Sequence, residues 1–303
     1  MRGGKMTHKV AMITIVGRAN VGKSTLTNKL TGDKVAIVSP KPQTTRNRIF
    51  GVFSHGDSQI ILLDTPGFHK AKTILGDYMV GVVKESVADV DAVALIVEPV
   101  NNVGTQEEML LDHIKKTGVP VVLVINKIDT VKPEIILPVI ESYSQHFSFG
   151  AIVPVSAKNG DGISDLVEVF EMYAKPGPQL FPEGISTDQP ERQVIAEIIR
   201  EKLLLCLDKE IPHGTAVEIT KFSERGDEER SVIDVDATIF CEKQSHKGMI
   251  IGRNGAMLKK IGKLARTDIE RFMGAKVFLQ TWVKVKENWR DSKSMIKNFG
   301  YTK

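Results

Sequence analysis

The stretch Gly17-Arg-Ala-Asn-Val-Gly22-Lys23-Ser24 decides the fold of the N-terminal half of this chain. It matches the pattern G-x-x-x-x-G-K-[ST] and stands between the apolar run Val10–Val16 and a helical pattern over Lys23–Leu30. A strand, a glycine loop and a helix in this order form a nest of backbone N–H groups that binds phosphate at a helix N-terminus. We expect Lys23 to contact the β- and γ-phosphates of a nucleotide and the Ser24 hydroxyl to ligate Mg²⁺.

Further short apolar runs follow, and helical patterns separate them. The runs lack polar alternation, which is typical of interior strands in a parallel sheet covered on both faces. The alternation of strands and helices predicts a doubly wound α/β domain. The expected strands are Val10–Val16, Gln59–Leu63, Ala92–Val97, Val119–Ile125 and Ala151–Val155, and the expected helices include Lys23–Leu30, Gln106–Lys116 and Gly162–Lys175.

Three more motifs follow successive apolar runs, at the expected carboxyl ends of strands. In Asp64-Thr65-Pro66-Gly67, a carboxylate can hold a water of the metal ion and a glycine amide can face the γ-phosphate. In Asn126-Lys127-Ile128-Asp129, the Asp129 carboxylate can accept both the ring N–H and the exocyclic amine of guanine, a pair that adenine cannot form. The backbone of Ser156-Ala157-Lys158 can bind the guanine carbonyl oxygen. Each motif alone is common, but all four in this order predict a GTP site.

The polar stretch Pro42-Gln-Thr44-Thr45-Arg46 lies where a switch segment would order around Mg²⁺ and the γ-phosphate. Either threonine could be the metal ligand. In related translational GTPases the ligand lies three residues after the proline, which favours Thr45. The expected metal ligands are Ser24, Thr45 and Asp64, the last through water, and the expected GTP-binding residues are Gly17, Arg18, Ala19, Asn20, Val21, Gly22, Lys23, Ser24, Thr25, Asp64, Thr65, Pro66, Gly67, Asn126, Lys127, Asp129, Ser156, Ala157 and Lys158.

Phe68 occupies the position at which Ras-like proteins carry the glutamine that orients the attacking water. Phenylalanine cannot hydrogen-bond water, so we expect slow intrinsic hydrolysis and a role for Phe68 beyond packing. Asn20 offers one route to charge stabilisation, because the same asparagine in similar GTPases ligates K⁺ beside the phosphates. The alternative is that Asn20 only caps the loop. The expected catalytic residues are Asn20, Lys23, Thr45 and Gly67.

A segment that repeatedly breaks helices, Lys175-Pro-Gly-Pro-Gln-Leu-Phe-Pro-Glu-Gly184, separates this half from a second domain. Beyond it the order of patterns is α-β-β-α-α-β. The expected elements are a helix over Glu191–Leu207, strands over Ala216–Phe222 and Val232–Glu242, a helix from Lys247, a helix over Met257–Phe272, a strand over Lys276–Lys286 and a last helix near Trp289–Asn298. We expect a GTP-binding domain over residues 1–175, a linker over 176–190 and an RNA-binding domain over 191–303.

The charge of the chain is unevenly distributed. Residues 241–303 contain 15 Lys and Arg against 5 Asp and Glu, whereas the other residues contain 26 basic and 32 acidic groups. Within this basic region, Gly252-Arg253-Asn254-Gly255 joins two helical patterns, and a G-x-x-G loop in this place clamps the backbone of about four nucleotides in KH domains. The alternative for Lys259 and Lys260 is a solvated helix face. The expected RNA contacts are Lys247, Gly248, Gly252, Arg253, Asn254, Gly255, Lys259 and Lys260.

Taken together, Gly-Arg-x-Asn-Val-Gly-Lys-Ser, Pro-Gln-Thr-Thr-Arg, Asp-Thr-Pro-Gly-Phe-His and Ser-His-Lys-Gly-Met-Ile-Ile-Gly-Arg-Asn-Gly resemble the Era-like family of bacterial GTPases from Lys9 to about Tyr301. The resemblance implies a P-loop GTPase domain followed by a type II KH domain that binds the 3′ end of 16S rRNA. It further implies GTP hydrolysis in assembly of the small (30S) ribosomal subunit, RNA affinity that depends on the bound nucleotide, and peripheral contact of some members with the inner membrane. Ala19 departs from the proline of many relatives, which alters loop rigidity and removes no ligand.

Composition narrows the remaining alternatives. A hydrophobic content of 42%, two cysteines, no long apolar stretch and no signal peptide predict a soluble, cytoplasmic protein. We also expect it to be a monomer. A GTPase that serves RNA modification would need a catalytic cysteine or a further cofactor site, and neither is evident. A constitutive RNA-binding protein with a vestigial nucleotide site is disfavoured by intact Lys23, Ser24, Asp64 and Asp129. A membrane-signalling GTPase would need a lipidation motif, which the C-terminal sequence lacks.

Overall fold

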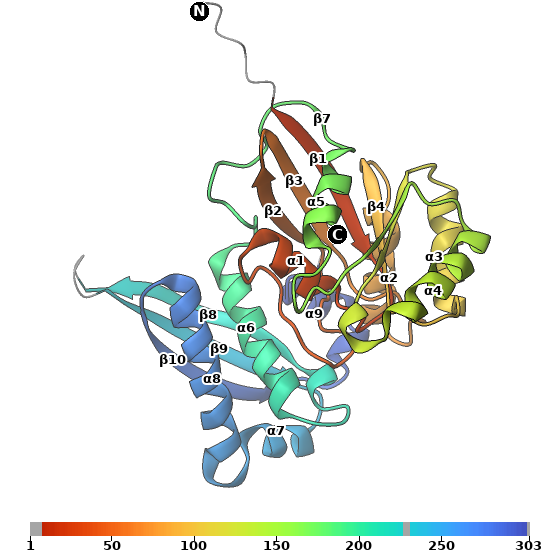
Figure 1. Cartoon of the computed structure of the whole chain (residues 1–303). Coiled ribbons are helices and arrows are strands. Elements are labelled where there is room, and N and C mark those ends of the chain that lie inside the picture. Colours follow the sequence, from red (N-terminus) through yellow and green to blue (C-terminus); the bar gives the residue numbers. More distant parts are fainter. Residues whose placement is uncertain (1–7, 227–230, 302–303) are drawn as a thin grey trace, which may run out of the picture. The chain divides into compact units, whose positions relative to one another are not determined.

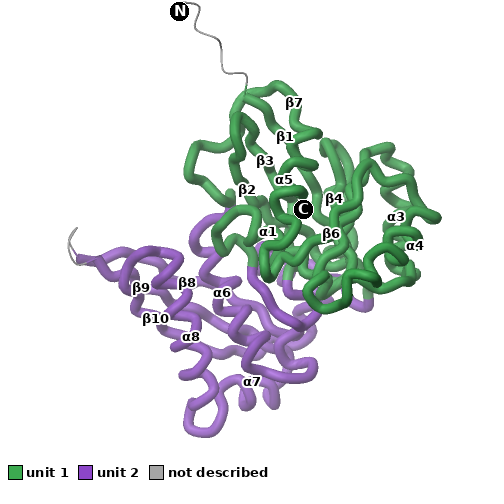
Figure 2. The backbone as a smooth tube through the Cα atoms, viewed as in Figure 1, with its two compact units in different colours: residues 1–36, 45–71, 76–188 green, residues 37–44, 72–75, 189–303 purple. Residues whose placement is uncertain are grey.

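The chain forms two compact units, shown in separate colours in Figure 2. A computed structural model describes residues 8–226 and 231–301. Residues 1–7 of the expected GTP-binding domain and residues 227–230 and 302–303 of the expected RNA-binding domain therefore lie outside the described residues. Unit 1 contains most of residues 1–188. Unit 2 contains Gln189–Lys303 together with the short segments Ile37–Thr44 and Lys72–Leu75.

Unit 1 is built on a mixed sheet with strand order β2-β3-β1-β4-β5-β6 (Figure 1). β3, β1, β4, β5 and β6 run parallel, as the apolar runs predict, whereas β2 is antiparallel to β3 and the two-residue β7 is antiparallel to β1. The strands are β1 (Lys9–Val16), β2 (Ile49–His55), β3 (Ser58–Asp64), β4 (Ala92–Val97), β5 (Val121–Ile125), β6 (Ala151–Pro154) and β7 (Lys175–Pro176).

Both faces of this sheet are buried, which explains why its strands lack polar alternation. On β4, for example, Ala94 and Ile96 pack in one core and Val93 and Leu95 in another. The helix expected to reach Lys175 ends at Glu171. The covering elements are α1 (Lys23–Thr31), α2 (Ile74–Ser86), α3 (Thr105–Lys115), α4 (Ile136–His146), α5 (Ile163–Glu171) and the 3₁₀ turns η1 (Ile128–Thr130) and η2 (Pro133–Ile135).

Unit 2 has the predicted order α-β-β-α-α-β, built on a sheet with strand order β10-β9-β8. β9 is parallel to β10 and antiparallel to β8, and α6, α7 and α8 pack on one face of the sheet. The second expected helix begins at Gln244, three residues before Lys247. The elements are α6 (Glu191–Cys206), η3 (Pro212–Gly214), β8 (Ala216–Arg225), β9 (Val232–Cys241), α7 (Gln244–Ile251), η4 (Arg253–Gly255), α8 (Ala256–Met273) and β10 (Lys276–Val285).

The C-terminal segment differs from the single helix that the sequence predicts. It forms the turn η5 (Trp289–Asp291) and then the short helix α9 (Lys293–Asn298). The hydroxyl of Ser292 accepts a hydrogen bond from the Met295 N–H at the start of α9, which explains why the helix restarts there. Among the residues that the structure describes, no helix combines the length and the apolar character that a membrane span requires.

Candidate functional sites

The phosphate-binding loop lies between β1 and α1 and depends on a glycine at its last turn. Gly22 has φ +98°, and a Cβ built on it would lie 2.3 Å from Nδ2 of Asn126, so only glycine fits. The buried Lys23 crosses the loop, where its ammonium group donates to the carbonyl oxygens of Gly17 (3.2 Å) and Arg18 (2.8 Å). The loop therefore holds a fixed shape with a cation beside it, which suits a polyphosphate.

Three oxygen atoms expected to surround Mg²⁺ lie together at the start of α1. The Ser24 hydroxyl oxygen is 2.8 Å from the Thr45 hydroxyl and 2.7 Å from Oδ2 of Asp64. The Thr44 hydroxyl instead donates to the Lys41 carbonyl oxygen (2.6 Å). Oδ1 of Asp64 is buried and has no hydrogen-bond partner among the described residues. A hard cation with oxygen ligands fits this cluster, because it would satisfy the remaining carboxylate oxygen.

Burial makes both charges of this site unfavourable. It raises the pKa of Asp64 to about 6, although the Lys23 ammonium partly opposes that shift. It also lowers the pKa of Lys23 to about 8, partly opposed by the Asp64 carboxylate. Since desolvation disfavours the charged form of each group, an added cation beside Asp64 and an anion beside Lys23 would stabilise both.

The Asn-Lys-Ile-Asp motif connects the phosphate loop to the expected guanine site. Asn126 donates to the Val21 carbonyl oxygen (2.8 Å) and accepts from the Ala157 N–H (3.0 Å), so one buried side chain joins three loops. The exposed Asp129 carboxylate accepts a hydrogen bond from the Ser156 hydroxyl at 2.7 Å. This bond fixes one carboxylate oxygen and leaves the group accessible to a base.

Arg18 belongs to the loop, but its side chain pairs with residues outside the four motifs. It forms ion pairs with Glu107 of α3, which is buried, and with Glu98 (3.7 Å). Glu98 also binds the Lys127 ammonium (2.5 Å), which in turn donates to the Asn20 carbonyl oxygen (2.6 Å). Sequence reasoning missed Glu98 and Glu107, because neither stands in a recognisable pattern.

Phe68 and the expected catalytic residue Asn20 differ in their surroundings. Phe68 is only 5% exposed and packs in the core with Val16 and Val83, while its N–H donates to the Gly17 carbonyl oxygen (3.0 Å). The structure therefore places the Phe68 side chain in packing, where we expected a further role. The Asn20 side chain is exposed, and no hydrogen bond joins it to the described part of the chain.

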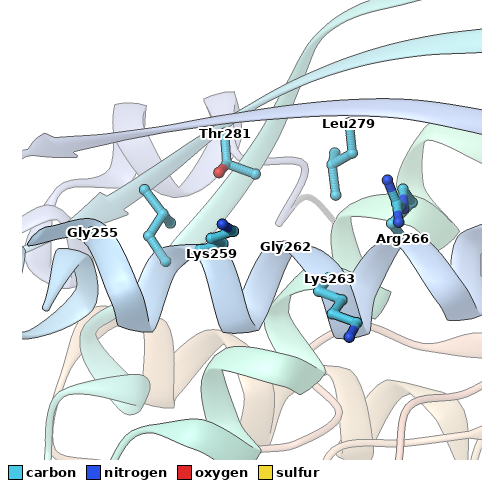
Figure 3. A pocket seen from close by; sticks show the side chains of 8 residues that line it. Gly255, Lys259, Gly262, Lys263, Arg266, Leu279 and Thr281 are labelled. Atoms are coloured by element: carbon cyan, nitrogen blue, oxygen red, sulfur yellow. The ribbon is translucent and has the colours of Figure 1, made fainter.

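The second site is a cleft of about 470 Å³ in unit 2, between α8 and β10 (Figure 3). At one end the chain turns through Gly252, where φ is +73° and a Cβ would lie 2.7 Å from the Cβ of Met257. Arg253 and Asn254 are exposed at the tip of the turn. The lining residues are Gly255, Leu258, Lys259, Gly262, Lys263, Arg266, Leu279 and Thr281.

Only part of the expected RNA-binding set lines this cleft. Gly255 and Lys259 do, whereas Lys247, Gly248 and Lys260 are not among its lining residues in the described chain. Lys263 and Arg266 were missed, although they follow Lys259 at helical spacing and share its face of α8. Leu279 and Thr281 point from β10 toward α8 and close the opposite wall (Figure 3).

Comparison with family models defines the class of the protein. Residues 12–127 match the family described as 50S ribosome-binding GTPase, and residues 210–290 match the KH domain. Together with the two sites above, these matches define a P-loop GTPase that is joined to a KH domain.

Comparison with individual proteins gives the particular family. GTPase Era of Ruminiclostridium cellulolyticum is 49% identical over 98% of both chains, and that of Alkaliphilus oremlandii is 48% identical over 98% of this chain and 100% of its own. This chain belongs to the Era family of GTPases.

Solved structures agree with this assignment. A crystal structure of Era in complex with MgGDPNP and nucleotides 1506–1542 of 16S ribosomal RNA is 39% identical, with a TM-score of 0.93 over 98% of this chain and 100% of that one. A point variant of Aquifex aeolicus Era bound to GDP·AlF₄⁻ is 38% identical, with a TM-score of 0.93 over 97% and 100% of the two chains.

Proposed function

We propose that this GTPase binds the 3′ end of 16S rRNA in the α8–β10 cleft and acts in assembly of the small ribosomal subunit. The relative that contains 16S rRNA nucleotides 1506–1542 supports the choice of RNA. The observation that carries this proposal is the cleft, which is lined by Lys259, Lys263 and Arg266 of α8 and by Leu279 and Thr281 of β10. Cations of this kind attract phosphates, and the apolar wall suits unstacked bases.

Gly262 adds an independent reason to expect a ligand in this cleft. It lies inside α8, where glycine costs about 1 kcal/mol relative to alanine. A Cβ on Gly262 would meet nothing within 4 Å, so packing within the protein does not require glycine here. Close approach of an RNA strand would require it.

In unit 1 we assign the Mg²⁺ ligands to Ser24, Thr45 and, through water, Asp64. The convergence of their oxygens and the unsatisfied Oδ1 of Asp64 support this set over one that contains Thr44. Mg²⁺ bound there supplies positive charge that stabilises the phosphoryl group in transfer. Lys23 neutralises phosphate charge, the Gly67 N–H faces the γ-phosphate, and Asp129 selects guanine. The exposed Asn20 side chain contributes to a K⁺ site that takes the place of a catalytic glutamine.

RNA affinity that depends on the bound nucleotide has a physical route through the segment Ile37–Thr44. This segment belongs to unit 2, where the buried Arg200 of α6 donates to the carbonyl oxygens of Gln43 (3.3 Å) and Thr44. The next residue along the chain, Thr45, stands beside Ser24. When the nucleotide changes what Thr45 binds, the adjacent residue Thr44 is affected, and Thr44 belongs to the segment that Arg200 of α6 binds.

We place the GTP-binding domain at residues 1–175, the linker at 176–190 and the RNA-binding domain at 191–303, in a cytoplasmic monomer with peripheral membrane contact at most. Sedimentation of the purified protein tests the monomer, and fractionation of cells tests the location.

Binding of an RNA that carries the 3′ end of 16S rRNA tests the central proposal. Replacing both Arg253→Asp and Asn254→Asp keeps the glycines and places two negative charges at the tip of the turn. RNA affinity should fall, and each lost phosphate contact should reduce the slope of affinity against salt by about 0.7. GTP affinity, measured on the same preparation, monitors the fold. If this variant binds the RNA as tightly as wild type, the cleft is not the RNA site.

A further inference from the structure

The two faces of β10 differ in a way that the cleft does not explain. Leu279 and Thr281 face α8, while every second residue points to the opposite side of the sheet. We call these residues the outer strip, and all five are exposed: Lys276, Phe278, Gln280, Trp282 and Lys284. Phe278 is 50% exposed and Trp282 44%, which is unusual for aromatic side chains on a strand.

The outer face of this sheet is covered at one end only. Phe240 on the neighbouring β9 is buried and packs against Phe299, with ring centroids 4.9 Å apart. Trp289 is also fully buried in this C-terminal segment. The chain thus shields one aromatic group on this face and leaves Phe278 and Trp282 open to a ligand.

The charges along β10 favour a polyanion. Lys276 and Lys284 form no ion pair within the described ranges, and β10 contributes no acidic group to its strip. The Arg225 guanidinium of β8 lies 6.0 Å from the centre of the Phe278 ring, but its charge is already paired with Asp234, so Lys276 and Lys284 are the unpaired cations of the strip.

The acidic side chains of this face lie on the central strand β9 and on β8, which is the other edge strand of the sheet. Asp234 is paired with Arg225 (2.8 Å) and Lys221 (3.5 Å). Asp236 is the register partner of Gln280 in the outer strip, and Glu218 lies one strand farther away, on β8. The free positive charge is therefore concentrated on β10.

We infer that the outer strip is a second contact surface for single-stranded RNA, which takes bases of the same strand that lies in the cleft. This inference rests on the proposed RNA-binding function. Bases stack on exposed aromatic rings, and lysines at both ends can contact the phosphates. The Cα atoms of Phe278 and Trp282 are about 13 Å apart along a strand, so each ring takes a separate base.

Continuity with the cleft is the reason to choose RNA as the occupant. β10 is an edge strand of its sheet, and it pairs only with β9 in the described structure. A strand of RNA that leaves the cleft reaches the outer strip by crossing this free edge, because the two surfaces are opposite faces of one β-strand.

Two RNAs distinguish the strip from the cleft. One is a four-nucleotide RNA that occupies the cleft alone, and the other carries the same four nucleotides with four more on each side. The double variant Phe278→Ala, Trp282→Ala should bind the long RNA at least about fivefold more weakly for each ring removed, and should bind the short RNA like wild type. The control Phe272→Ala removes an exposed aromatic group from α8 and should change neither affinity.

Tryptophan emission gives a direct readout, since the chain has two tryptophans and Trp289 is buried. The long RNA should quench wild-type emission by stacking on Trp282, the short RNA should not, and Trp282→Phe should abolish the quenching. If the double variant binds the long RNA as tightly as wild type, or if anionic phosphatidylglycerol vesicles and not RNA change the Trp282 emission, the inference is wrong while the cleft remains. If neither RNA binds the wild-type protein, the proposed function fails first and the inference with it.

Discussion

Replacing Gly262 by alanine should stabilise unit 2 and at the same time weaken its RNA binding. Within α8, alanine is favoured over glycine by about 1 kcal/mol. The added methyl group meets no atom within 4 Å, so this gain should appear in full as a higher free energy of unfolding. The same methyl group enters the cleft beside Lys259 and Arg266. Displacing a closely packed RNA strand costs about 1–3 kcal/mol, which corresponds to at least about fivefold weaker binding.

Urea unfolding followed by tryptophan emission measures the first effect, because both tryptophans lie in unit 2. Fluorescence anisotropy of a labelled 16S rRNA 3′-end fragment measures the second. Thr267→Ala is the matched control, since it raises helix propensity in the same helix at a residue that does not line the cleft. It should leave RNA affinity unchanged. Unchanged RNA affinity in Gly262→Ala would refute the argument that an RNA strand requires glycine at this position.

Asp129→Asn exchanges the carboxylate for an amide, so the variant should lose affinity for GTP and gain affinity for xanthosine triphosphate. Equal GTP affinity in wild type and variant would show that Asp129 does not recognise the base. Replacing K⁺ by Na⁺ at constant ionic strength should slow GTP hydrolysis by wild type and hardly affect Asn20→Ala; equal wild-type rates in the two salts would exclude the K⁺ site. Arg200→Lys removes the guanidinium fork that holds Gln43 and Thr44. The ratio of RNA affinities with GDPNP and with GDP should move toward one in this variant, and an unchanged ratio would contradict the route through Ile37–Thr44.

Some expectations from the sequence depended on residues whose surroundings lie elsewhere in the chain. Phe68 stands where a catalytic glutamine would stand, and the sequence predicted for it a role beyond packing; its side chain is buried in the core that also contains Val16 and Val83. The sequence offered Thr44 and Thr45 equally, and the resemblance favoured Thr45. The structure brings the Thr45 hydroxyl to Ser24 and turns that of Thr44 to the Lys41 carbonyl oxygen.

The sequence by itself determined the nucleotide class and the order of the elements. A phosphate loop binds through its own backbone, so the spacing of Gly17, Gly22 and Lys23 indicates it, and the three further motifs in order, with Asp129 for guanine, identify a GTP site. The parallel strands can be recognised in the sequence as short apolar runs, because both faces of their sheet are buried.

Only the tertiary structure decided which side chains share a site. The ion pairs of Arg18 with Glu98 and with Glu107 of α3 join segments about 80 to 90 residues apart in sequence. The cleft in unit 2 forms when α8 packs beside β10, which brings Arg266 of α8 near Leu279 and Thr281 of β10 (Figure 3). Such contacts depend on how segments that are distant in sequence pack together. Local patterns of hydrophobicity and charge do not indicate which distant side chain a residue will contact.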